Sequence, residues 1–219
     1  MEKIIGLLDK YYMVYLQGLW GTLWISAVTV LCGTLLGLLI AAFRMSRSKI
    51  LNSFASAYIE VLRGTPILLQ LYFFWIGLPK LLPFELSDTM CIVVALVINA
   101  SAYISEIIRG SLLSLDQTQL DAARAVGFTR RQAVVHVILP QLVARTLPAL
   151  TGQFASIIKD SSLLSLIAVI ELTQTMREIS AANFRLFECY LVLGLLYLCL
   201  TLPVSFISER LERRFRYEA

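Results

Sequence analysis

The stretch WGTLWISAVTVLCGTLLGLLIAAF, residues Trp20 to Phe43, decides the fold class of this chain. It contains no charged residue and is closed by Arg44, Arg47 and Lys49. A helix that crosses the hydrocarbon core of a bilayer needs about 20 mainly apolar residues. We therefore predict a membrane-spanning helix here. The stretch is too long and too rich in glycine for a cleavable signal peptide, so we expect it in the mature protein.

Four further apolar runs follow, at 65–78, 90–108, 146–170 and 189–207. The run at 65–78 is the shortest and has an apolar lead-in from Ile50. Across the 219 residues, 58% are hydrophobic and only 16% are charged, and the mean hydropathy is +0.76. A soluble domain carries about 25% charged residues. These features predict an all-α integral membrane protein, with residues 1–219 forming one domain of five spans.

Basic residues predict the orientation, because they gather in the cytoplasmic loops of membrane proteins. An N-terminus outside and a C-terminus in the cytoplasm put twelve of the 19 lysines and arginines inside and five outside. The inner set is Arg44, Arg47, Lys49, Arg109, Arg124, Arg130, Arg131, Arg145, Arg210, Arg213, Arg214 and Arg216, and the outer set is Lys3, Lys10, Lys80, Arg177 and Arg185. The net charge of +4 then reflects topology, so nucleic-acid binding is a poor reading of it.

The longest polar interruption, residues 109–145, falls on the predicted cytoplasmic side. Thr118 followed by Asp121 predicts a short helix over 120–126, with the hydroxyl as its cap. Gly127 tolerates the left-handed backbone that ends many helices. Thr129 with Gln132 repeats the capping pattern and predicts a second helix that ends before Pro140.

This loop resembles the Glu-Ala-Ala loop of ABC importer permeases. The matching residues are Asp121, Ala122, Ala123, Arg124, Gly127, Ile138, Leu139 and Pro140. Asp121 replaces the usual Glu, and Thr118 stands where the family often has Gly. Other segments resemble signatures of the polar amino acid subgroup. They are Gly18 to Ser26, Arg63-Gly64-Thr65-Pro66 with Gln70, the set Ala102, Tyr103, Glu106, Arg109 and Gly110, and Lys159 to Leu163.

The resemblance implies a transport subunit of the bacterial inner membrane and not an enzyme. Two such subunits, identical or paralogous, pair around the translocation path, two ATPase subunits bind below, and an extracytoplasmic binding protein delivers a polar amino acid. ATP and Mg belong to the ATPase, and no cofactor is expected on this chain. The coupling helix would use Asp121, Ala122, Ala123, Arg124 and Gly127, because small side chains let a helix sit deep in a partner's groove.

Helical spacing predicts a substrate path. Asn99, Tyr103 and Glu106 share one stripe of the third span, and Gln153, Ser156 and Asp160 share one stripe of the fourth. Polar residues in lipid are expensive and usually functional. The alternative is a structural lock, in which Glu106 pairs with Arg109 and Asp160 is neutralised by Lys159 or a helix end.

Other features are assigned structural roles. The small residues Thr22, Ser26, Thr29, Gly33 and Gly37 recur on one stripe of the first span, which predicts close helix packing. The only histidine, His136, has no metal-type neighbour at ligand spacing, and no nucleotide-binding glycine motif occurs.

Two competing functions differ in class from an importer subunit. A self-contained secondary carrier or channel usually has internal repeats, and none is visible here. A membrane assembly or sensor subunit without a conduit would not need the intramembrane charges Glu106, Lys159 and Asp160. Co-purification of ATPase subunits with this chain would distinguish the first function from both others.

Overall fold

The computed structural model describes residues 2–83, 85–116 and 118–216, and all secondary structure in this part of the chain is helical, with no strand. The α-helices are α1 (Glu2–Arg44), α2 (Lys49–Gly64), α3 (Ile67–Leu81), α4 (Asp88–Leu113), α5 (Thr118–Ala125), α6 (Arg130–Ala133), α7 (Leu139–Asp160), α8 (Leu172–Asn183) and α9 (Leu186–Arg216). A π-helical turn, η1 (Val134–Ile138), joins α6 to α7, and a 3₁₀ segment, η2 (Ser161–Ile167), follows α7.

Four helical stretches are long and apolar enough to cross a membrane: Gly6–Arg44, Asp88–Leu113, Arg130–Ile167 and Leu186–Phe215. The bent pair α2 and α3 is also long and apolar enough when the two helices are taken together. If this pair is one span, the number of candidate spans is five. The chain is therefore an all-helical protein with four or five candidate spans.

The run predicted at 65–78 corresponds to α3, and its apolar lead-in from Ile50 lies in α2, so the two helices form a bent pair. The axes of α2 and α3 meet at 109°. Thr65 and Pro66 between them have extended backbones, with ψ of 146° and 135°. Proline disfavours the helical region for the residue before it, so α2 ends there and a new helix begins in a new direction.

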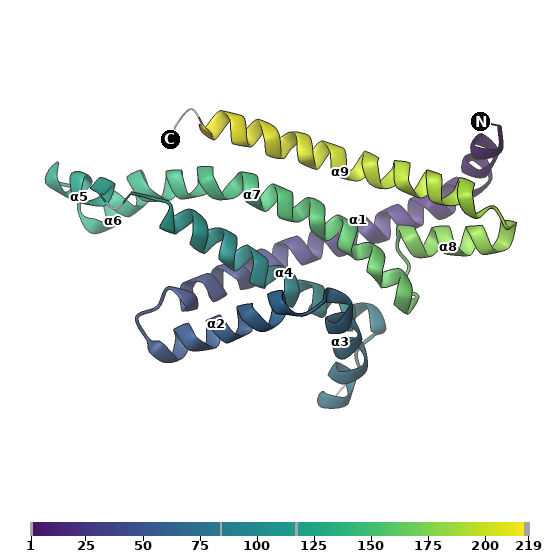
Figure 1. The fold of residues 1–219 in the computed structure, drawn as a ribbon, viewed down its shortest axis with the longest axis horizontal. Coiled ribbons are helices and arrows are strands. Elements are labelled where there is room, and N and C mark those ends of the chain that lie inside the picture. Colours follow the sequence, from purple (N-terminus) through teal and green to yellow (C-terminus); the bar gives the residue numbers. More distant parts are fainter. Residues whose placement is uncertain (1, 84, 117, 217–219) are drawn as a thin grey trace.

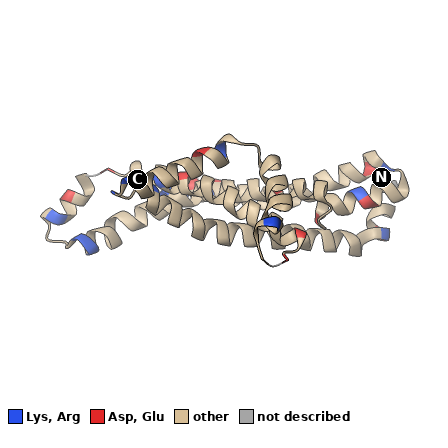
Figure 2. Cartoon of the chain, turned by 90° about the horizontal axis from the view of Figure 1, so that it is seen from below, with Lys and Arg blue, Asp and Glu red and all other residues tan. Residues whose placement is uncertain are grey.

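The molecule is elongated, with α5 and α6 at one end and α8 at the other (Figure 1). Helix α1 begins beside α8 and runs toward the opposite end, where it turns into α2. Helix α9 returns from α8 toward the end that carries α5 and α6. Most of the length of the long helices carries no charged residue (Figure 2), as expected for helices surrounded by lipid.

The stripe of small residues on α1 is a packing surface, as predicted. Thr22 and Thr29 are fully buried. A Cβ atom added at Gly33 would lie 3.2 Å from the Cβ of Ala100, and one at Gly37 would lie 2.8 Å from the Cγ2 of Ile104. Both neighbours belong to α4, so the missing side chains allow α1 and α4 to approach closely.

The second helix of the polar loop does not end before Pro140, which corrects the sequence prediction. Leu139 donates its backbone N–H to the carbonyl of Val134, five residues back, and the chain continues into α7. Pro140 then occupies the first turn of α7, where a missing N–H costs little. The π-helical turn η1 thus carries the helix past the proline, and helical structure starts well before the predicted boundary at residue 146.

Helix α8 was not predicted and lies in the loop expected between the last two spans. The fully buried carboxylate of Glu171 caps it by accepting the N–H groups of Thr173 at 2.8 Å and Gln174 at 2.6 Å. The hydroxyl of Tyr197 on α9 also donates to Glu171, at 3.0 Å. Glu171 therefore attaches the start of α8 to α9.

Candidate translocation path and coupling surface

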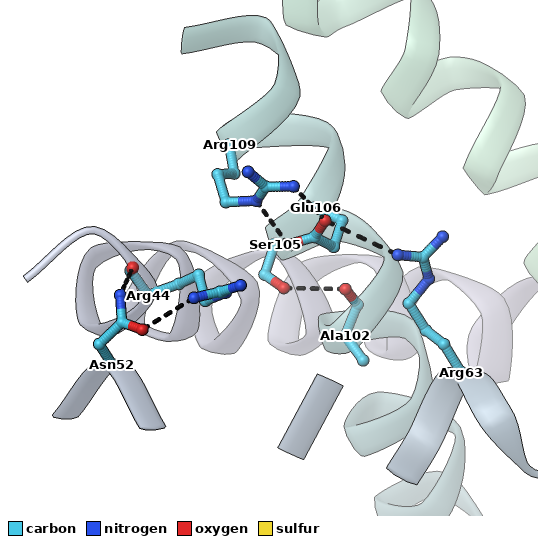
Figure 3. Close-up of polar contacts among 7 residues, drawn as sticks. All are labelled: Arg44, Asn52, Arg63, Ala102, Ser105, Glu106 and Arg109. Atoms are coloured by element: carbon cyan, nitrogen blue, oxygen red, sulfur yellow. Dashed lines mark hydrogen bonds and ion pairs between the residues drawn. The ribbon is translucent and has the colours of Figure 1, made fainter. Parts of the chain in front are cut away.

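Glu106 lies between two arginines from different helices (Figure 3). Arg109, one turn further along α4, donates through Nε and Nη2 to the two carboxylate oxygens, both at 2.7 Å. Arg63 of α2 places its Nη1 3.7 Å from Oε2 of Glu106. The alternative in which Glu106 pairs with Arg109 is therefore present in the structure, and Arg63 extends the pair into a cluster.

Tyr103 belongs to the same cluster. The guanidinium carbon of Arg63 lies 5.4 Å from the centre of the Tyr103 ring, within the range of a cation–π interaction. Arg63 thus contacts both Tyr103 and Glu106, one turn apart on α4. The tyrosine and the carboxylate form one surface together with α2.

Asn99 holds the break between α2 and α3 against α4. Its side-chain amide donates to Oε1 of Gln70 at 2.9 Å. The amide of Gln70 donates in turn to the carbonyl of Leu62 and to Oγ1 of Thr65, both at 2.8 Å. The Gln70 side chain therefore provides hydrogen bonds to a backbone carbonyl and a hydroxyl group at the break. The hydrogen bond from Asn99 holds the Gln70 side chain in this position.

The polar stripe of α7 is separate from that of α4 within one chain. The two helices meet through apolar side chains, chiefly Ile104 and Ile108 with Ile157. Gln153, Ser156 and Asp160 are half-buried, and in the described part of the chain no hydrogen bond or ion pair joins them to Asn99, Tyr103 or Glu106. Over the same residues, Asp160 makes no ion pair with Lys159. A path shared by both stripes would need a surface that this chain does not supply alone.

The short helix α5 has the predicted position and a well-formed end. Gly127 has a φ of +93°, the left-handed conformation that glycine tolerates best. The N–H of Gly127 donates to the carbonyl of Arg124 at 3.0 Å, and that of Phe128 donates to the carbonyl of Ala123 at 3.1 Å. These two bonds form a Schellman motif, which satisfies the last carbonyls of α5.

Two details of α5 differ from the prediction. Asp116, and not Thr118, makes the observed N-terminal contact, because Oδ1 of Asp116 accepts the backbone N–H of Thr118 at 2.9 Å. This bond lowers the pKa of the Asp116 carboxyl. Of the two alanines, Ala123 is buried at 7% exposure whereas Ala122 is exposed. A partner approaching this end of the molecule would meet Ala122 but not Ala123.

The exposed surface around α5 combines charge with apolar side chains. Asp121 and Arg124 pair loosely at 3.6 Å on its outer face. Val126 is 76% exposed and Phe128 is 41% exposed. A protruding apolar tip with charges beside it has the composition of a contact surface for another protein.

Sequence reasoning underestimated two residues beside the path and one at the start of α8. Arg63 and Gln70 were noted as parts of a signature, but their contacts cross from α2 and α3 to α4, which helical spacing within one span cannot reveal. Glu171 was not selected at all. Glutamate is not among the residues preferred at a helix N-cap, so this cap gave little signal in the sequence.

Comparisons with known proteins match most of this chain. Residues 33–217 match the family described as binding-protein-dependent transport system inner membrane component. The chain is 40% identical over 202 residues to the glutamine transport system permease protein GlnP of Escherichia coli (strain K12), with 92% of each chain covered. It is 34% identical over 215 residues to the probable glutamine ABC transporter permease protein GlnM of Bacillus subtilis (strain 168), covering 96% of this chain and 99% of the relative.

A solved structure agrees with these relatives. A chain in the crystal structure of an amino acid ABC transporter with histidines superposes with a TM-score of 0.86 at 38% identity. The superposition covers 94% of this chain and 96% of that one.

Proposed function

Because the chain belongs to the family of binding-protein-dependent transport system inner membrane components, we propose that it imports a polar amino acid as one membrane subunit of an ATP-driven transporter. The observation that carries this proposal is the 40% identity to a glutamine permease over 92% of both chains. The self-contained carrier is not favoured, because the relatives named above are permease subunits of ABC transporters or glutamine transport systems.

The N-terminus and the α8 end face outward, and the α5 end faces the cytoplasm of a bacterial cell. This orientation is supported by the distribution of basic residues. The α1–α2 turn, the α5–α6 region and the end of α9, which carry most of the predicted inner arginines, lie toward the same end of the molecule (Figure 1).

The α5 surface docks on an ATPase subunit, which binds ATP and Mg. Ala122, Val126 and Phe128 provide the contact, Asp121 and Arg124 set its register at the rim, and Gly127 sets the turn that presents them. Ala123 supports this surface from beneath.

The substrate path lies between this chain and a second permease subunit, identical or paralogous. Gln153, Ser156 and Asp160 of α7 are not covered by α4 and are half-exposed in the single chain, so a partner helix is needed to enclose them. Asn99, Tyr103 and Glu106 line or support the same path from α4. An amino acid delivered by an extracytoplasmic binding protein has an ammonium and a carboxylate, which such donors and acceptors can hold.

Reconstitution of the chain with its ATPase, its permease partner and its binding protein in proteoliposomes tests the proposal. We expect uptake of labelled glutamine, or of another polar amino acid in a panel, that requires both ATP and the binding protein. A complex whose ATPase cannot hydrolyse ATP is the matched control. Equal uptake by this control, or by the chain alone, would favour the carrier.

A further inference from the structure

The ends of α4, α7 and α9 nearest to α5 border an open cavity of about 670 Å³. It is separate from the Glu106 cluster and from the exposed tip of α5. Its lining residues are Gly110, Ser111, Ser114, Ala144, Arg145, Pro148, Ala149, Ser208, Glu212 and Phe215. None of the residues named above for the translocation path or the coupling surface lines this cavity, although Gly110 and Ala149 continue the two polar stripes toward α5.

The limits of the apolar runs place the cavity at the depth expected for lipid headgroups. The apolar runs of the three helices end at Ile108, Thr146 and Ile207 on this side, and the lining residues cluster around these limits. The step from Ile207 to Glu212 corresponds to about 7 Å along a helix. The polar layer of a bilayer is about 5–8 Å thick on each side. This placement does not depend on which side of the membrane the cavity faces.

A positive and a negative side chain line the cavity without pairing with each other. Arg145 is held in place because its Nη1 donates to the carbonyl of Ser114 at 2.5 Å and to its Oγ at 3.0 Å. A guanidinium has five N–H donors, so others stay available for a ligand. Glu212 is exposed on α9, and within the described residues it makes no ion pair with Arg145.

The rest of the lining is partly apolar. Pro148, Ala149 and Phe215 supply hydrocarbon surface. The hydroxyl of Ser208 donates to the carbonyl of Pro148 at 2.9 Å and thereby ties α9 to α7 beside the cavity. A small polar solute would make few favourable contacts with this hydrocarbon surface. The glycerol and the upper acyl carbons of a phospholipid would pack against it.

We propose that this cavity binds the headgroup of a zwitterionic phospholipid, such as phosphatidylethanolamine. The phosphate pairs with the guanidinium of Arg145, a geometry that arginine forms readily. The ammonium lies toward Glu212, and the glycerol lies against Pro148 and Phe215. An anionic headgroup without an ammonium would keep the phosphate contact but meet an unpaired Glu212. The site therefore selects for a headgroup that carries both charges.

The test uses the full transporter complex, purified and incorporated into nanodiscs of equimolar phosphatidylethanolamine and phosphatidylglycerol, followed by native mass spectrometry of the retained lipids. We expect the wild-type complex to retain phosphatidylethanolamine over phosphatidylglycerol by about threefold to fivefold, the upper part of the range for one exposed charge pair. Glu212→Lys should reverse the preference. Glu209→Lys, which makes the same charge change on α9 outside the cavity lining, should leave it unchanged.

Arg145→Gln should reduce retention of both lipids, and Ala149→Trp should do the same by filling the cavity. Because Glu212 is exposed, its substitution should not disturb folding, and the result stays interpretable if the cavity-filling variant assembles poorly. The proposal is overturned if Glu212→Lys and Glu209→Lys retain the same lipids as the wild type. Displacement of the bound lipid by free glutamine would also overturn it, in favour of an amino acid site.

Discussion

Arg109 lies one turn after Glu106 on α4 and donates two hydrogen bonds of 2.7 Å to its carboxylate. With Arg63 at 3.7 Å, the carboxylate also connects α4 to the end of α2, just before the chain breaks at Thr65 and Pro66. Glu106 is therefore positioned to hold the broken span, and any contact with substrate must compete with two arginines.

Replacing Glu106 with Gln should lower the stability of the subunit by about 1–2 kcal/mol, because two guanidinium groups lose their partner at a partly exposed site. The measurement is thermal unfolding of the purified complex. Glu60→Gln, on the exposed face of α2, is the control and should have little effect. An unchanged unfolding temperature combined with lost uptake would instead identify Glu106 as a substrate contact.

Gly37→Ala should destabilise the packing of α1 against α4. The new Cβ would lie 2.8 Å from a side-chain carbon of Ile104 and 3.1 Å from the backbone oxygen of Ser101, so one of its neighbours is backbone that yields poorly. We expect a loss of about 1–3 kcal/mol in the free energy of unfolding. Gly194→Ala, where no atom lies within 4 Å of the added carbon, is the matched control. Equal effects of the two substitutions would contradict this account of the α1 stripe.

The buried carboxyl of Glu171 should make the stability of the α8 region depend on pH. Burial raises the pKa of its carboxyl above the usual range, although the N–H groups of Thr173 and Gln174 and the hydroxyl of Tyr197 oppose the shift. A raised folded-state pKa means that the charged form is penalised in the folded state. The contribution of this group to stability therefore improves as the pH falls from above that raised pKa toward the unfolded value of about 4.3.

Hydrogen exchange of α8 amides at pH 5.5 and pH 8, corrected for the intrinsic exchange rate, measures this dependence. Wild-type protein should be better protected at the lower pH, and Glu171→Gln should reduce the difference between the two. Glu178→Gln, an exposed change on the same helix, should leave the difference intact. Better protection of the wild type at pH 8 would show that the cap bonds outweigh burial.

The features that sequence predicts well are those encoded locally. Apolar length predicted four of the spans, residue spacing predicted the α1 packing stripe, and Gly127 with the Thr129–Gln132 capping box predicted the turns of the polar loop. These signals act within one helix or one turn, so the residues themselves carry them.

The features that failed depend on local backbone hydrogen bonding or on contacts between distant segments, which residue patterns do not reveal. Nothing near Pro140 signals that a π-helical turn will carry the chain past it. Ala123 is buried on the inner face of α5 because of the way this helix packs against the rest of the chain. A break beside Pro66 is signalled locally, but its angle of 109° and the contact of Gln70 with Asn99, 29 residues apart in sequence, are not.

The coupling proposal makes opposite predictions for two adjacent alanines. Ala122 is exposed, so Ala122→Trp should leave the subunit folded but block the groove contact of α5 and reduce ATP-driven uptake at least tenfold, which corresponds to about 1.4 kcal/mol of lost contact. Ala123 is buried, so Ala123→Trp should disturb the loop itself and lower expression or stability. Ala182→Trp, an exposed alanine on α8 at the other end of the molecule, controls for the added surface.

Uptake, and ATPase activity stimulated by the binding protein, should both fall in Ala122→Trp while membrane levels match the wild type. Gly127 adds a graded test, because its φ of +93° strains any residue with a Cβ although no atom blocks that carbon. Asn tolerates the left-handed region better than a β-branched residue does, so Gly127→Asn should retain more coupling than Gly127→Val. Full coupling in Ala122→Trp would remove α5 from the ATPase contact, because bulk on its outer face would then be irrelevant to transport. Equal losses in the Asn and Val variants would contradict the role of backbone strain at Gly127.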